Sequence, residues 1–360
     1  GILAERIDPF PLRCVPLAAV PAGEWDRFAG IRGTVFHTLA FREVLLRSFG
    51  YGCAYHAILD GGGRVRALLP LVTGRNLAFR RAGVSLPFAN AVDICADGVD
   101  ALRAVLAALP AIRKKHGLDF IELRLKSGLE AAPAEYRPGL VNRGNVTFVL
   151  PLEPDEGAVL ALSSAGNRNH VRKVLKNHWF DASFDPARLP AFHRVYVRRM
   201  KQLGSPAPEL LFFEQFFARF SGQAALLTAL DRETGKVAGG MLLLVSPADR
   251  TVYYPFGAGL VEHNRRYLNS FMYWEAVRFG IRSGMRFLDL GRSPAGSGTY
   301  RYKQQWGAEE QQLHYMTFGG KTAAGQPGRE GFSLATGLWK KLPAFVTDRS
   351  GERLIKYVLP

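Results

Sequence analysis

The chain of 360 residues has few cysteines and no long apolar run. Its three cysteines, Cys14, Cys53 and Cys95, have no CxxC spacing, so a reducing compartment is the simpler inference. No stretch approaches the roughly 20 apolar residues that a membrane-spanning helix needs, and the amino end lacks a secretory signal pattern. We therefore expect a cytoplasmic protein, with contact at the inner face of the cytoplasmic membrane as an open alternative.

The sequence also lacks the common signatures of metal sites and of covalent catalysis. Its eight histidines are scattered without the spacing of metal ligands, so we predict no metal. No Ser-x-x-Lys, Gly-x-Ser-x-Gly or Cys-His signature marks a nucleophile. For a group-transfer reaction, direct transfer within a ternary complex is therefore favoured over a covalent intermediate.

Acidic side chains are too few to balance the bases. The 47 Lys and Arg residues against 31 Asp and Glu give a formal charge of +16. A surplus of this size attracts anionic partners through long-range electrostatics. An arginine-rich composition inherited from the genome explains the same surplus, and the charge alone leaves both interpretations open.

One short pattern occurs twice in the chain. Residues 117–124 read Gly-Leu-Asp-Phe-Ile-Glu-Leu-Arg, and residues 284–292 read Gly-Met-Arg-Phe-Leu-Asp-Leu-Gly-Arg. In both copies a helix-ending glycine precedes a short apolar strand that carries one acid. The chain therefore looks duplicated. Small residues, hydroxyls and bases crowd residues 292–303 after the second copy, which points to the second half as the place of the chemistry.

Each predicted unit is an antiparallel meander followed by a helix and a final strand. In the first unit the pattern predicts a helix at 34–50, strands at 55–59 and 65–72, a loop through 85–90, a helix at 99–116 and a strand at 120–125. In the second unit it predicts strands at 224–230, 237–245 and 251–256, a helix at 269–283 and a strand at 287–290. The expected fold class is α+β, with mostly antiparallel sheets flanked by helices.

Three helices are predicted between the two units. In the first of them, at 166–176, Arg168, Arg172 and Lys176 align at i, i+4 and i+8, and no acid is available there for i+4 pairing. This basic stripe is either a solvated face or a contact for an anion. The third helix, near 210–220, carries a row of aromatic residues that we assign to the core.

Two residues at the end of the second copy are candidates for chemistry. Asp289 serves either as a base or, like Glu122 in the first copy, as a hydrogen-bonding group that orients a loop. Arg292 is placed to grip phosphate or carboxylate with two parallel hydrogen bonds. An ion pair with a nearby acid is the competing interpretation of Arg292.

Two further candidates follow a Ser297-Gly298 hinge. We prefer Tyr300 as a general acid and Lys303 as a phosphate or oxyanion contact, against the alternative that both are ordinary surface residues. If the segment is a strand, alternation places Tyr300 and Tyr302 on one side and Lys303 on the other.

The second half also resembles a known family. The run from Phe256 through Asp-Leu-Gly-Arg-Ser at 289–293 to Lys-Gln-Gln-Trp-Gly-Ala at 303–308 resembles the FemAB-like acyltransferases, whose domain is also described as BioF2-like. The closest resemblance is to FemAB-related proteins that accompany exopolysaccharide and PEP-CTERM/exosortase systems, over roughly residues 30–318. The chain departs from larger relatives because it has no coiled-coil arm, and from simple GNAT enzymes because residues 262–266 stand where a glycine-rich pyrophosphate loop is expected.

The resemblance implies two tandem GNAT-like domains. Residues 1–150 would form the acceptor side and 151–318 the donor and catalytic side. The tail at 319–360 mixes basic and apolar residues; we expect it to dock on the body, with contact to a membrane surface as the alternative. The implied reaction is amide formation, in which an aminoacyl or acyl group passes from aminoacyl-tRNA or an acyl thioester to an amine of a cell-envelope or exopolysaccharide precursor. The alternatives are an acyl-CoA-dependent N-acetyltransferase acting on a small amine and a non-catalytic descendant that binds RNA or glycan. A monomer without a tightly bound cofactor is expected.

Residue by residue, the predicted site has three groups. The predicted catalytic residues are Asp289, Arg292, Tyr300 and Lys303, the donor-binding residues are Arg168, Arg172, Lys176, Asn269, Ser293 and Ser297, and the acceptor-binding residues are Ser85, Asn90 and Arg124.

Overall fold

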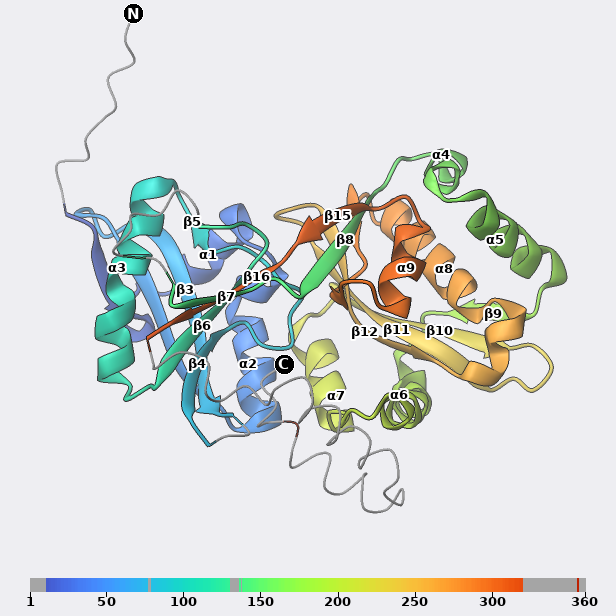
Figure 1. Cartoon of the computed structure of the whole chain (residues 1–360), viewed down its shortest axis with the longest axis horizontal. Coiled ribbons are helices and arrows are strands. Elements are labelled where there is room, and N and C mark those ends of the chain that lie inside the picture. Colours follow the sequence, from blue (N-terminus) through green and yellow to red (C-terminus); the bar gives the residue numbers. More distant parts are fainter. Residues whose placement is uncertain (1–10, 77–78, 130–135, 137, 320–354, 356–360) are drawn as a thin grey trace, which may run out of the picture.

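The computed structural model of the chain describes residues 11–76, 79–129, 136, 138–319 and 355. Two eight-stranded sheets occupy opposite halves of the molecule (Figure 1). The first sheet contains β1 (Arg13–Pro16), β2 (Gly52–Leu59), β3 (Val65–Arg75), β4 (Arg81–Ser85), β6 (Phe120–Leu125), β16 (His314–Phe318) and β7 (Leu140–Asn142) in that order, with β5 (Cys95–Ala96) beside β3. The second contains β14 (Ser293–Pro294), β8 (Asn145–Pro151), β13 (Phe287–Asp289), β12 (Thr251–Gly259), β11 (Val237–Ser246), β10 (Ala224–Asp231) and β9 (Phe180–Ser183), with β15 (Glu309–Gln312) beside β8.

The two copies of the sequence pattern occupy equivalent positions in the two sheets. β6 follows helix α3 (Val99–Lys115) and pairs in parallel with β4, so that Glu122 lies opposite Val84. β13 follows helix α8 (Leu268–Arg282) and pairs in parallel with β12, so that Asp289 lies opposite Tyr253. The other described strand pairs of both sheets are antiparallel. The predicted fold class and the predicted duplication are confirmed.

A ribbon of exchanged strands joins the two sheets. β7 and β8 follow each other in the chain, as do β15 and β16, and the two segments run antiparallel through both sheets. β8 thereby enters the second sheet beside β13, and β16 enters the first sheet beside β6 (Figure 1). The division between 1–150 and 151–318 stays a prediction, because each sheet contains a strand from across that boundary.

Two predicted elements of the first unit are wrong in detail. The helix predicted at 34–50 is a 3-10 turn, Val35–His37, followed by α2 (Leu39–Phe49). The chain breaks there because the His37 ring accepts the backbone N–H of Thr34, which closes a capping box around the short turn. The predicted loop at 85–90 begins only after β4, a strand that the apolar pattern did not reveal.

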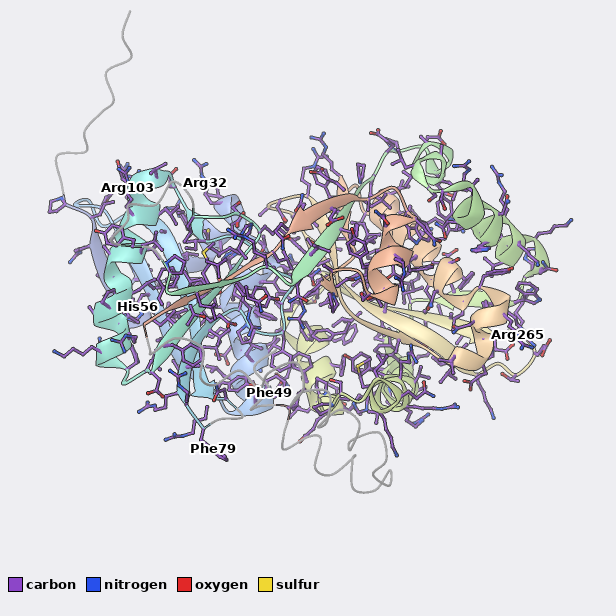
Figure 2. All side chains as sticks on the ribbon, in the orientation of Figure 1. Arg32, Phe49, His56, Phe79, Arg103 and Arg265 are labelled. Carbon is purple, nitrogen blue, oxygen red and sulfur yellow. The ribbon has the colours of Figure 1, made fainter. Side chains whose placement is uncertain are left out.

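The core between the sheets is shared by both units. It contains the inner face of each sheet and helices α1 (Glu24–Arg32), α2, α6 (Leu189–Leu203) and α7 (Leu210–Arg219). Phe49 lies where the halves meet (Figure 2), stacked on Phe88 at 4.5 Å and 5.0 Å from Phe212 between ring centroids. The expected aromatic core row on α7 is confirmed. Ile355 is buried in this core, whereas the rest of the tail at 320–360 lies outside the described residues.

Each sheet has a second core on its outer face. α3 covers the outer face of the first sheet, with Val105, Leu109 and Ile112 facing the strands. The outer face of the second sheet packs against α8 and α5 (Ala165–Asn177). Ser164 starts α5, because its hydroxyl accepts the backbone N–H of Asn167.

The shared core predicts that the two units unfold together. Phe216 of α7 is fully buried among rings of both units, so we expect Phe216→Ala to lower the free energy of unfolding by about 3–5 kcal/mol. Chemical denaturation should show a single transition moved to lower denaturant. Leu211→Ala on the same helix is the control, because Leu211 is 41% exposed and its loss should change stability by less than about 0.5 kcal/mol. Two separate transitions, with one of them unmoved, would contradict the shared core.

Candidate active site

In the second unit, β12 and β13 run side by side and then separate. Their last pair is Tyr253 with Asp289. Just beyond it, one residue of β11 faces two residues of β12, Tyr254 and Pro255, which form a bulge. A bulge bends its strand, and proline supplies no N–H to a ladder. Within the described chain no strand pairs with residues 254–259 on the β13 side, so β12 presents a free edge roughly 20 Å long.

The segment after the second copy folds into a short helix, α9 (Gly298–Gln304). The Ser297 hydroxyl accepts the backbone N–H of Tyr300 at 3.1 Å and so caps the helix. The segment is therefore a helix and not a strand, so the alternation expected of a strand does not apply to Tyr300 and Tyr302. In a helix, residues three apart are neighbours, which places Tyr300 beside Lys303 instead. The predicted hinge at Ser297 and Gly298 stays a prediction.

Lys303 is buried where the two strands separate. Its Nζ donates to the carbonyl oxygens of Gly291 at 2.9 Å and Arg292 at 3.2 Å. Burial lowers the pKa of Lys303 to about 8; the carboxylate of Asp289 opposes this shift and the guanidinium of Arg292 adds to it. An ammonium carries three N–H donors, so the protonated side chain keeps one donor beyond these two bonds.

Tyr300 is placed differently from the other tyrosine of the helix. Its hydroxyl donates to Glu310 on β15 at 2.7 Å, and this bond raises the pKa of Tyr300. A phenol whose pKa is raised stays protonated at neutral pH, as a general acid must. Tyr302 is more enclosed: burial raises its pKa to about 12, and its ring packs on Tyr273 at 5.2 Å.

Asp289 is fully buried and fully engaged. Its Oδ1 accepts hydrogen bonds of 2.8 Å from Asn90, from the Thr147 hydroxyl and from the backbone N–H of Gly291. Its Oδ2 pairs with Lys126 at 2.8 Å. Four partners leave this carboxylate no free role as a base, so the contacts support the loop-orienting interpretation of Asp289.

Two of these partners come from the first unit. The side-chain nitrogen of Asn90 donates to Asp289, and the predicted role of Asn90 toward the acceptor stays a prediction. The sequence reasoning did not select Lys126 or Thr147. Lys126 directly follows the strand of the first copy, as Arg292 and Ser293 follow the strand of the second. That parallel position was the signal that could have identified it.

Arg292 is exposed at the rim of the site. Its Nη1 donates to the hydroxyl of Tyr315 at 3.0 Å. Among the described residues no carboxylate lies within ion-pair distance of Arg292. The alternative interpretation, an ion pair between Arg292 and a nearby acid, therefore has no support among the described residues. We continue to favour the predicted role of Arg292 as an anion clamp.

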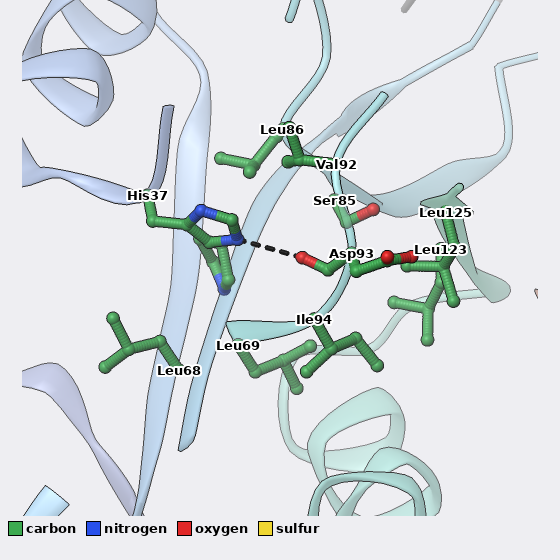
Figure 3. A pocket seen from close by; sticks show the side chains of 11 residues that line it. His37, Leu68, Leu69, Ser85, Leu86, Val92, Asp93, Ile94, Leu123 and Leu125 are labelled. Carbon is green, nitrogen blue, oxygen red and sulfur yellow. Dashed lines mark hydrogen bonds between the residues drawn. The ribbon is translucent and has the colours of Figure 1, made fainter. Parts of the chain in front are cut away.

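The matching place in the first unit is closed. The Ser85 hydroxyl accepts the backbone N–H of Arg124 at 2.8 Å, which ties the end of β4 to β6. Figure 3 shows the small space beyond it, lined by apolar side chains and by His37, which donates from Nε2 to the Asp93 carbonyl at 3.0 Å. Because Nδ1 of His37 accepts a backbone N–H and burial lowers its pKa to about 4, this ring is neutral. Ser85, predicted to bind the acceptor, is thus engaged within its own unit.

The far end of the free edge lies at the start of α8. The 3-10 turn η5 (Val261–Arg266) leads into it, and Arg266 fixes this turn through ion pairs with Asp231 and Glu233. Arg265 is exposed at this end of the molecule (Figure 2). The α8 helix has no side-chain cap, so its first backbone N–H groups stay open to an anion.

An aromatic and basic cluster lies beside that helix start. The ring of Tyr267 stacks on His170 of α5 at 4.4 Å, and the Nζ of Lys173 lies 5.3 Å from its centroid. The predicted basic stripe of Arg168, Arg172 and Lys176 lies on a different face of α5 from His170 and Lys173. Arg172 and Lys176 are exposed, whereas Arg168 donates to the carbonyl of Ser163. Lys173 was not selected from the sequence.

The other predicted donor-binding residues have mixed surroundings. Asn269 is exposed on the first turn of α8 beside Gly259, at the end of the free edge. Ser293 is fully buried, and Ser297 caps α9. Their roles toward a donor stay predictions.

The described part of the chain contains no group of three His, Cys, Asp or Glu side chains arranged to hold a metal ion. None of its helices combines the length and apolar character needed to cross a membrane.

A family profile described as "Acetyltransferase (GNAT) domain" matches residues 167–304. This range contains β12, β13, α8 and α9, the elements that form the candidate site. No curated protein matches the sequence.

Several solved structures share the fold over most of the chain. FemX has a TM-score of 0.66 at 14% identity, over 84% of this chain and 96% of its own. The C-terminal domain of a putative lysylphosphatidylglycerol synthetase from Agrobacterium fabrum has a TM-score of 0.55 at 10% identity, over 88% and 96%. A tandem GNAT protein from the clavulanic acid biosynthesis pathway has a TM-score of 0.53 at 13% identity, over 86% and 100%. The chain has the FemAB-like tandem GNAT fold, and it is an acyltransferase with a GNAT domain.

The buried ion pair between the units predicts an unequal response to two charge deletions. Lys126→Met leaves the fully buried Asp289 without its cation, so we expect a loss of about 3 kcal/mol in unfolding free energy. Arg198→Met breaks an ion pair whose side chains are 56% and 44% exposed and should cost less than about 1 kcal/mol. Denaturant titration of both variants measures the difference. Equal losses would show that the Lys126 pair does not hold the units.

Proposed function

We propose that this acyltransferase forms an amide by direct transfer of an aminoacyl group from an activated donor to an amine. The observation that carries the proposal is the separation of β12 from β13. It leaves a free strand edge between an uncapped helix start and the Lys303 ammonium. An extended donor can lie along that edge with its phosphate at α8 and its reacting carbonyl near Lys303.

The chemistry follows from the groups at the inner end of the edge. The acceptor nitrogen attacks the donor carbonyl, a carbon–nitrogen bond forms, and the bond from carbon to the leaving oxygen or sulfur breaks. The third N–H of Lys303 stabilises the oxyanion. The leaving group displaces Glu310 as the acceptor of the Tyr300 proton and takes that proton, and Tyr300 regains a proton from solvent. The attacking nitrogen loses its proton to solvent. Asp289 orients the Gly291 turn instead of acting as the base.

Aminoacyl-tRNA is the donor that we favour. The cluster of His170, Tyr267 and Lys173 beside the start of α8 combines stacked rings with a base, a combination that suits single-stranded nucleic acid. Arg265 adds an exposed charge at the same end. The name of the synthetase among the structural relatives, lysylphosphatidylglycerol synthetase, denotes an aminoacylated product, which supports the same choice.

An acyl thioester such as acyl-CoA is the second candidate. The match to a GNAT acetyltransferase domain favours it, and the structure of the clavulanic acid relative is described as one "without AcCoA". Against it, Glu262-His263-Asn264-Arg265-Arg266 stands where a glycine-rich pyrophosphate loop would be. For the acceptor we propose an amine of a cell-envelope or exported polysaccharide precursor, reached at the inner face of the membrane; this rests on the resemblance alone.

Mass spectrometry of parallel reactions distinguishes the donors. Purified protein is supplied with an amine mixture and either charged tRNA or acyl-CoA, each with and without ribonuclease. Aminoacyl transfer that ribonuclease abolishes is the expected result. Transfer from acyl-CoA that ribonuclease leaves unchanged would replace our choice by the second candidate, and no product from either donor would contradict the proposal.

The protonation of Lys303 predicts a pH effect. The ammonium needed for the third N–H is present below a pKa of about 8 and is lost as pH rises through it. Lys303→Arg keeps its charge over that whole range. We therefore expect the ratio of the wild-type rate to the Lys303→Arg rate to fall roughly tenfold for each pH unit above 8. Titration of the acceptor amine is common to both proteins and cancels in this ratio. A ratio that rises with pH would make neutral Lys303 a base instead.

A further inference from the structure

Tyr315 lies where the two sheets meet and contacts one arginine from each unit. Its hydroxyl accepts a hydrogen bond of 3.0 Å from Nη1 of Arg292, which follows β13. Its ring centroid lies 5.1 Å from the guanidinium carbon of Arg124 on β6. β16, which carries Tyr315, pairs directly with β6. The exchanged strand therefore brings two guanidinium groups to one phenol ring.

The two arginines differ in how their charge is neutralised. Nε of Arg124 donates to Glu122 at 2.7 Å, and both side chains are only 11% exposed. Arg292 faces solvent, and no described carboxylate lies within ion-pair distance of it. Its bond to Tyr315 uses one N–H of the guanidinium group, which has five. The Tyr315 hydroxyl accepts that bond, so its own proton remains available to another acceptor.

The surroundings add positive charge. Nζ of Lys303 donates to the backbone carbonyl oxygen of Arg292 at 3.2 Å. The ammonium of Lys303 therefore lies close to the backbone of Arg292 and adds a second positive charge to this region. The acid nearest to Arg292 along the chain, Asp289, is buried and paired with Lys126. The rim therefore offers fixed N–H and O–H donors with an uncompensated charge, the arrangement that binds phosphate and carboxylate oxygens.

We infer that Arg292 and Tyr315, backed by Arg124, form a subsite for an oxyanion carried by the amine acceptor. The inference rests on the proposed function for its assignment to the acceptor. The phosphate of the donor would lie at the start of α8, at the other end of a free edge roughly 20 Å long. An anion at Arg292 instead lies next to Lys303, so the acceptor bears its phosphate or carboxylate close to its reacting nitrogen.

Binding of simple anions tests the subsite without any turnover. Isothermal titration of the full chain with inorganic phosphate and with acetate gives two dissociation constants. Arg292→Gln should weaken the tighter of the two at least about tenfold, because it removes a charge-assisted donor. Tyr315→Phe should weaken it severalfold although it removes no charge. Arg301→Gln is the matched control, since Arg301 is an exposed arginine of the adjacent helix and its loss should leave both constants unchanged. Equal effects of Arg292→Gln and Arg301→Gln would overturn the subsite.

Acceptor selection tests the assignment. Phosphoethanolamine, β-alanine and ethanolamine are compared as amines with the donor that supports transfer. We expect an anionic amine to exceed ethanolamine at least about tenfold in kcat/KM, and Arg292→Gln to abolish that preference. Whether phosphoethanolamine or β-alanine is preferred identifies the oxyanion. Inorganic phosphate that competes with the donor instead of the amine would assign the anion to the donor and overturn the inference. Because the titration needs no donor, a chain without transferase activity would leave its result intact.

Discussion

A fully buried carboxylate, Asp289, determines how the two halves of this protein fit together. An ionised group without water must have its charge and its lone pairs satisfied by the protein. Asp289 obtains this from Lys126 and Asn90 of the first unit, from Thr147 on the exchanged strand and from the Gly291 turn that follows it. A displacement of either unit would remove partners from this carboxylate. The same turn receives Lys303, so the interaction that joins the units also shapes the site.

The duplication supplied two similar frameworks that differ at one step. In both units a strand with one acid pairs in parallel with its predecessor over three residues. In the second unit, the bulge at Tyr254 and Pro255 turns β12 away from β13 and leaves the edge of β12 without a neighbouring strand. In the first, Ser85 ties β4 to β6, and the chain then leaves the sheet through Leu86 and Phe88. Both residues have left-handed backbone conformations, with φ of 46° and 65°. Such backbone is costly for residues with a Cβ, and here it delivers Asn90 to Asp289.

The sequence predicted those parts of the fold that local patterns determine. The strand at 120–125 is found with the predicted bounds, and the strands and helix of the second meander agree within a few residues, because alternation and helix-ending glycines are local signals. The exchanged ribbon was not predictable in this way, since β8 and β16 pair with strands more than a hundred residues distant. The contacts of the site were not predictable for the same reason. Asp289 and Lys126 are separated by 163 positions, and Tyr315 reaches both arginines only because the exchanged ribbon places β16 in the first sheet. The seven-residue helix α9 was too short to show a period.

The shared core restricts how a substrate can reach the site. Rings from α2, α7 and β12 pack together across the middle of the molecule, and opening the units would expose them to water at a large free-energy cost. Access by a hinge between the units is therefore disfavoured. In the proposed reaction the acceptor instead approaches Lys303 from the open rim, where the guanidinium of Arg292 and the hydroxyl of Tyr300 face solvent. The proposed donor comes from the opposite end of β12, so the two substrates would meet end to end along a strand edge that is already formed.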